Sequence, residues 1–87
     1  MTDIDALLAE RGAEYGDFMH VAEVYGGIIF ALKNGVHYAV DNHSELAMNM
    51  IAVKMARLVC GNPNNIDSWE DIAGYATLVV KVLRNAT

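Results

Sequence analysis

Three carboxylates near the end of the chain are the first residues whose types and spacing suggest chemistry. Asp67 and Asp71 are four residues apart, so on a helix they project from one face, and Glu70 lies in the same turn. Mg²⁺ prefers oxygen ligands, and it needs few from the protein because it keeps waters and binds substrate phosphates. We therefore predict Asp67, Glu70 and Asp71 as magnesium ligands.

Two cations earlier in the chain are suited to the phosphate that such an ion accompanies. Lys54 and Arg57 are three residues apart, and the planar guanidinium group of arginine matches phosphate oxygens. Trp69 could stack on a base, although a packing anchor beside a helix start is the alternative. The predicted assignment is substrate binding by Lys54, Arg57 and Trp69. Asp71 and Lys54 are the predicted catalytic residues.

The structural alternative for the same charges is a salt bridge. Lys54 and Asp71 each interrupt an otherwise apolar helical face, so Lys54 or Arg57 could simply pair with Asp71 between two helices. The other carboxylates would then only complement the positive N-terminus of their helix. Ion-pair networks of this kind resemble functional sites, and the sequence leaves both interpretations open.

The elements that must position these residues are helices, because apolar residues recur at helical spacing between glycine- and asparagine-rich joints. The predicted helices cover about residues 2–12, 18–34, 44–60 and 67–84. Residues 36–43 are either an extended connection or an extra helical turn, and the stretch GAEYGDF is predicted to be a turn. Asp67 and Glu70 form a D-x-x-E variant of the capping box at the start of the last helix.

The last two helices are predicted to lie side by side and antiparallel, because the loop between them is short. We place the end of one helix, Cys60, opposite the start of the next, Asp67. Asp71 then falls at the height of Lys54 and Arg57. Two isolated charges, one on each helix, should therefore meet.

The composition describes a single all-α domain, residues 1–87, with more apolar surface than its own core needs. Hydrophobic residues make up 54% of the chain, above the roughly 45–50% of typical soluble proteins. We interpret the surplus as a subunit interface. The predicted architecture is an antiparallel bundle of about four helices, completed by a homodimer or a higher homo-oligomer.

Charge and hydropathy narrow the classes of function. The net charge of −5 disfavours DNA binding, which needs a concentrated positive patch, but it is compatible with a local basic pocket for one phosphate. No apolar run approaches the length of about 18 residues that a membrane span requires. The acidic start is unlike a signal peptide, and the single Cys60 allows no internal disulfide. We expect a cytoplasmic protein.

Three motifs resemble those of a family of small, mostly phage-encoded proteins of unassigned function. They are ERGAEYGDF at residues 10–18, ELAMNMIAVKMARL at 45–58 and GNPNNIDSWEDIAGYATL at 61–78. The resemblance covers most of the chain except residues near 30–43, and the last motif is the most specific. For a phage-encoded member, it implies a location in the cytoplasm of the host cell.

The same motifs are remotely similar to the MazG-like all-α nucleoside triphosphate pyrophosphohydrolases. These are magnesium-dependent helical dimers or tetramers that release pyrophosphate from nucleotides. Their usual pattern is E-x-x-E on one helix and E-x-x-D on the next. The second half of this pattern can be aligned with Asp67 or Ser68 and with Asp71. The resemblance implies a protein that binds or hydrolyses nucleoside phosphates with magnesium.

The first half of that pattern is missing from this chain. Lys54 and Arg57 stand where glutamates are usual, which removes two expected metal ligands. Glu14 and Asp17, from the glycine-flanked stretch, would have to replace them. The departure leaves a second hypothesis of another class, a non-enzymatic phage accessory protein that binds and modulates a host protein.

Overall fold

The computed structural model describes residues 2–86, and every regular element in this range is an α-helix. The four helices are α1 (Thr2–Tyr15), α2 (Phe18–Leu32), α3 (Asn42–Cys60) and α4 (Ile66–Asn85). The predicted all-α class is confirmed. Within the same range, no helix is both long enough and apolar enough to cross a membrane.

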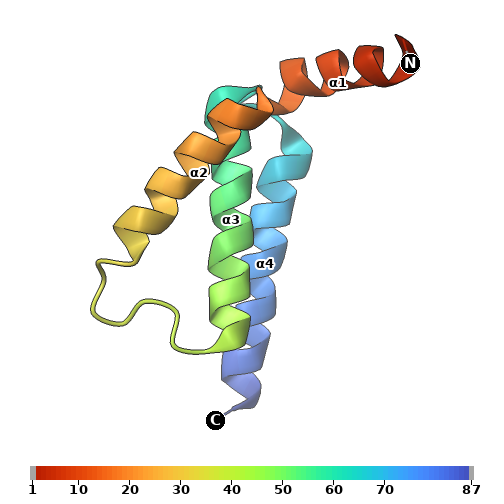
Figure 1. The fold of residues 1–87 in the computed structure, drawn as a ribbon. Helices are drawn as coiled ribbons and strands as arrows, with labels where there is room; N and C mark the ends of the chain where they lie inside the picture. The colour runs from red at the N-terminus through yellow and green to blue at the C-terminus, as the bar shows by residue number, and fades with distance from the viewer. Residues whose placement is uncertain (1, 87) are drawn as a thin grey trace.

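Helices α2 and α4 pack on either side of α3. Figure 1 shows α3 between α2 and α4, and α3 contacts both of these neighbours. The predicted antiparallel arrangement of α3 and α4 is confirmed. Helix α1 turns away from this group at the α1–α2 junction, so the four helices do not close into one bundle within a single chain.

The first junction lies later in the chain than predicted. Helix α1 continues through Gly12 to Tyr15, so the expected turn over GAEYGDF is wrong for its first half. The chain bends instead at Gly16, whose φ of 91° lies in the left-handed region that favours glycine. Asp17 then caps α2, because its carboxylate accepts a hydrogen bond of 3.1 Å from the backbone N–H of His20.

The cap of α4 also differs from the prediction. Asn65 is the N-cap, and its side-chain oxygen accepts a hydrogen bond of 2.7 Å from the backbone N–H of Ser68. The capping box predicted for Asp67 and Glu70 is therefore wrong. Asp67 lies inside the first turn of α4, where its charge still complements the positive end of the helix.

The connection between α2 and α3 is a series of turns without a further helix. Residues 33–41 reverse the chain, and Ala39 adopts a φ of 40°. The Tyr38 hydroxyl donates a hydrogen bond of 3.4 Å to the side-chain oxygen of Asn49 on α3. This contact holds the segment against the packed helices. The sequence alone did not decide between an extended connection and a helical turn for it.

The core is small for a chain that is so apolar. The buried apolar side chains in the described range are Ala47, Ala52, Ala56 and Leu58, all on α3, and no large side chain is fully buried. The radius of gyration is 15.1 Å, compared with roughly 12 Å for a compact domain of this length. One copy of the chain is therefore elongated and leaves much of its apolar surface open.

Candidate functional site

The two isolated charges of the sequence do meet. The Lys54 ammonium nitrogen on α3 lies 2.9 Å from a carboxylate oxygen of Asp71 on α4. The Lys54 side chain is 16% exposed and that of Asp71 is 49% exposed, so the pair lies at the edge of the helix seam. Of the two interpretations left open, this geometry favours the salt bridge, and the catalytic role of the pair stays a prediction.

The three carboxylates of α4 do not form a recognisable metal centre. Asp67, Glu70 and Asp71 are all exposed, and the carboxylate of Asp71 already forms an ion pair with the ammonium group of Lys54. Across residues 2–86, no group of three or more histidine, cysteine or acidic side chains could hold a metal ion. The described residues therefore show no metal centre, and magnesium binding stays a prediction from the sequence.

The other predicted substrate-binding residues point to two different places. Trp69 is 55% exposed, and its indole N–H donates a hydrogen bond of 3.0 Å to the backbone carbonyl of Pro63. That bond fits the packing-anchor alternative. Arg57 lies at the predicted height on α3, but its guanidinium group is near the ring of Tyr15, 5.9 Å from its centroid. The structure therefore separates Arg57 from the salt bridge.

A group of hydrogen bonds joins the end of α1 to the loop between α3 and α4. One carboxylate oxygen of Glu14 accepts hydrogen bonds from the side-chain amides of Asn62, at 2.9 Å, and Asn65, at 2.6 Å. The backbone carbonyl of Glu14 also accepts from the backbone N–H of Asn62 at 2.8 Å. We call this arrangement the Glu14 lock. It connects two of the three sequence motifs.

The Glu14 lock stabilises the charged form of its carboxylate. The hydrogen bond from the Asn65 side-chain amide lowers the pKa of Glu14 from its ordinary value of 4.5, and the hydrogen bond from the Asn62 amide lowers it by a smaller amount. Asp17, as shown above, is the cap of α2. Both acids that could have replaced the missing glutamates therefore have structural partners.

Two glycines allow the backbones to approach closely at this junction. A Cβ atom on Gly16 would lie 2.6 Å from the Cβ of Cys60, which is closer than real side chains approach. A Cβ atom on Gly61 would meet the backbone of α1 at the carbonyl oxygen of Glu14 and, at 2.6 Å, the nitrogen of Gly16. The lock therefore fixes the angle at which α1 leaves α2 and α3.

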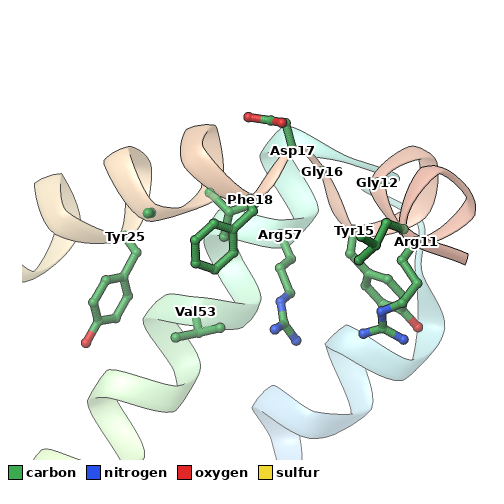
Figure 2. A pocket seen from close by; sticks show the side chains of 12 residues that line it. Arg11, Gly12, Tyr15, Gly16, Asp17, Phe18, Tyr25, Val53 and Arg57 are labelled. Atoms are coloured by element: carbon green, nitrogen blue, oxygen red, sulfur yellow. The ribbon is translucent and has the colours of Figure 1, made fainter. Parts of the chain in front are cut away.

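That angle opens a pocket of about 510 Å³ between α1, α2 and α3. Its polar and aromatic lining residues are Arg11, Tyr15, Asp17, Phe18, Tyr25 and Arg57. Figure 2 shows the rings and guanidinium groups beneath the α1–α2 junction, with the Asp17 carboxylate turned the other way. We call it the Tyr15 pocket.

Two guanidinium groups converge on the ring of Tyr15. The guanidinium carbon of Arg11 is 4.9 Å from the ring centroid, and that of Arg57 is 5.9 Å from it. Both distances are typical of cation–π contacts. Among the residues that the structure describes, neither guanidinium has a carboxylate within ion-pair distance. Within residues 2–86, this acidic protein therefore has a local pair of cations that form no ion pair.

Aromatic rings extend the pocket away from these cations. Phe18 is 80% exposed although it is fully apolar, and Tyr25 lies about two helical turns further along α2. Figure 2 places both rings on the same side of the junction as the guanidinium of Arg57. The arrangement can bind a ligand with an anionic group at one end and a flat ring at the other.

The sequence reasoning missed Arg11 and Tyr15. Their spacing was the available signal, because residues four apart on a helix share a face and an arginine can lie over an aromatic ring there. The predicted turn over GAEYGDF concealed it, since Tyr15 was expected beyond the helix end.

Comparison with known proteins gives a family and no activity. No curated protein and no solved structure is significantly similar to this chain. A family of unknown function does match residues 3–83, and this range includes nearly all of the four helices, the Glu14 lock and the Tyr15 pocket. The chain therefore belongs to the family described as a domain of unknown function, DUF6378.

Proposed function

We propose that this protein binds a nucleoside phosphate in the Tyr15 pocket. The observation that carries the proposal is the convergence of Arg11 and Arg57 on a pocket with aromatic walls, where neither guanidinium group has a carboxylate partner among the described residues. The phosphate groups would lie against the guanidinium groups. The base would lie against Phe18 and Tyr25.

The geometry of the cations supports a phosphate ligand. Each guanidinium carbon lies within 6 Å of the centroid of the Tyr15 ring, so we expect a single polyphosphate chain to contact both groups. Arginine binds phosphate through two parallel N–H donors, and such charge-assisted bonds are roughly twice as strong as neutral ones. The half-buried position of Arg57 strengthens this contact, because less water screens it.

The size and the walls of the pocket support a nucleoside rather than free phosphate. Ligand pockets typically measure roughly 300–1,000 Å³, and the 510 Å³ here suits one small organic ligand. Stacking on an aromatic side chain contributes roughly 1–3 kcal/mol per base and tolerates any base, because every base has a π-face. The pocket is therefore expected to select for phosphate more strictly than for base identity.

The resemblance to MazG-like pyrophosphohydrolases supports the same ligand class. It does not supply the metal ligands, because Asp71 is paired with Lys54 and the other carboxylates of α4 are exposed. The proposal is accordingly binding, and we expect it to occur without a divalent metal ion.

A calorimetric titration tests the proposal. The probes are a panel of ribo- and deoxynucleoside triphosphates, adenosine and inorganic pyrophosphate, each with EDTA and again with magnesium. We expect the nucleotides to bind at least about tenfold more tightly than adenosine or pyrophosphate alone, because only they reach both the cations and the rings. Product analysis for monophosphate and pyrophosphate in the magnesium arm tests hydrolysis. No binding of any nucleotide would refute the proposal.

The accessory-protein hypothesis has one supporting observation, the large area of exposed apolar side chains. A host protein that binds this area would be recovered in stoichiometric amount by the purified chain. The nucleotide panel distinguishes the two functions, because a purely accessory protein has no reason to bind any member of it.

A further inference from the structure

We propose that two copies of this chain form an antiparallel, two-fold symmetric dimer in which α1 of each copy packs against the C-terminal half of α4 of the other. The inference does not depend on the proposed nucleotide site. It rests on three features of the described residues: the excess surface of one copy, the exposed apolar side chains of α1 and α4, and the opposite charges of these two helices.

The surface of one copy is too large for a monomer of its mass. The accessible area is 6357 Å², whereas a folded monomer of 9.5 kDa exposes about 5,000 Å². The excess is about 1,300 Å² per chain. A dimer that hides this area on both copies buries roughly 2,600 Å² in total, which lies in the range of obligate homodimers. The excess is therefore large enough for the interface of a stable dimer.

Helix α1 shows where part of that surface lies. Its 14 residues make few contacts within the chain beyond the Glu14 lock, and Ile4, Leu7 and Leu8 are each more than half exposed. An isolated helix of this length is marginal in water, and Gly12 in its interior weakens it further. Helix α1 therefore needs an apolar partner surface that its own chain does not provide.

The C-terminal half of α4 offers such a surface. Leu78, Val80, Val82 and Leu83 are all exposed. Residues 76–86 contain two basic side chains, Lys81 and Arg84, and no acid. The first turn of α1 carries Asp3 and Asp5 and no base. The two surfaces are apolar and opposite in charge, so they complement each other.

The shape of the molecule makes the contact intermolecular. The start of α1 and the end of α4 lie at opposite ends of a molecule 52 Å long, as Figure 1 shows. A second copy related by a two-fold axis and reversed end to end brings its α4 to the first copy's α1. The symmetry repeats the contact in the other direction, so the assembly closes as a dimer.

Charge reversal tests this arrangement with the full chain. We expect sedimentation equilibrium to give a dimer of the unchanged protein, and Asp5→Lys or Lys81→Glu alone to raise its dissociation constant at least about tenfold. Mixing the two single variants should restore a heterodimer. In that heterodimer one contact pairs the two reversed charges, and the other pairs the two original charges.

Matched controls and the opposing outcomes complete the test. Glu23→Lys and Lys33→Glu, both exposed and outside α1 and α4, should leave the dissociation constant within about twofold. Far-ultraviolet circular dichroism checks that each variant keeps its helices. A monomer at all concentrations, or a dimer that neither reversal weakens, would overturn the proposal. Failure of the mixed variants to associate would overturn the α1–α4 pairing.

Discussion

At the scale of single residues, the charged side chains divide between a structural pair and a candidate binding site. Lys54 and Asp71 satisfy each other at the edge of the α3–α4 seam. An ion pair with a half-exposed partner contributes roughly 0–1 kcal/mol to stability, so this pair adds little to the free energy of unfolding. Arg11 and Arg57 have no acidic partner in the described range and face a pocket.

Glu14 gives the stability of the protein a dependence on pH. Its pKa is lowered in the folded state, so its contribution is present above pH 4.5 and is lost as the pH falls through the lowered value. We expect Glu14→Gln to be less stable than the unchanged protein at pH 7. The difference between their melting temperatures should shrink towards zero as the pH falls below 4.5 and through the lowered pKa of Glu14.

Glu10→Gln is the matched control for this prediction. Glu10 lies on the same helix and is exposed, and no hydrogen bond to its side chain occurs within residues 2–86. Its substitution should leave the melting temperature nearly unchanged at every pH. The difference in melting temperature caused by Glu14→Gln could instead stay constant over the whole pH range. That result would show that the hydrogen bonds from the side-chain amides of Asn62 and Asn65 do not favour the charged carboxylate.

At this scale the sequence predicted the pair and missed the pocket. Helical spacing and a short loop were enough to place Lys54 beside Asp71, because both depend on regular geometry alone. The approach of Arg11 to Arg57 depends on the direction of α1. That direction follows from Gly16 and from hydrogen bonds between residues about 50 positions apart, such as Glu14 and Asn65.

At the scale of elements, the junction between α1 and α2 determines the site. Asn62 and Asn65 lie in the loop before α4, yet their amides hold the last turn of α1. The GNPNN segment therefore caps one helix, through Asn65, and anchors another. One short polar loop therefore positions the ends of two helices.

Glycine substitutions test how tightly this junction is packed. We expect Gly61→Ala and Gly16→Ala each to lower the free energy of unfolding by about 2 kcal/mol or more. In both, the new Cβ meets backbone atoms under 3.0 Å, and Gly16 also has a positive φ. Urea denaturation measures the change.

Gly26 provides the opposite control. It lies inside α2, and a Cβ there would have nothing within 4 Å. Gly26→Ala should therefore raise the free energy of unfolding by roughly 0.5–1 kcal/mol, as expected for an exposed helix interior. If Gly61→Ala were as well tolerated as Gly26→Ala, the close approach of α1 to the α3–α4 loop would be wrong.

The helices themselves were predictable, but two of their ends were not. Apolar periodicity gave four segments close to those observed, because one face of each helix must be covered. The sequence predicts a helix end at Gly12, yet α1 passes through it because the bend occurs at Gly16. Its residue type predicts Asp67 as a cap, whereas Asn65 has the extended backbone conformation that a cap requires.

At the scale of the whole molecule, the chain is elongated and poor in core. Within the described range, four small or medium apolar side chains on α3 are the buried apolar set, and the radius of gyration exceeds that of a compact domain. The surplus of apolar residues in the composition therefore lies on the surface of one copy. The proposed dimer would cover α1, the helix that supplies Arg11 to the Tyr15 pocket, so assembly and ligand binding would be linked.

The most direct test compares two cations that lie one helical turn apart on α3. The nucleoside triphosphate panel is titrated calorimetrically, without metal, into Arg57→Gln and Lys54→Gln, with Arg11→Gln as a second pocket variant and circular dichroism as the check on folding. We predict that Arg57→Gln and Arg11→Gln weaken nucleotide binding about tenfold or more and that Lys54→Gln changes it less than about twofold. Loss of binding in Lys54→Gln with unchanged binding in both arginine variants would contradict the Tyr15 pocket and return the site to the Lys54–Asp71 pair.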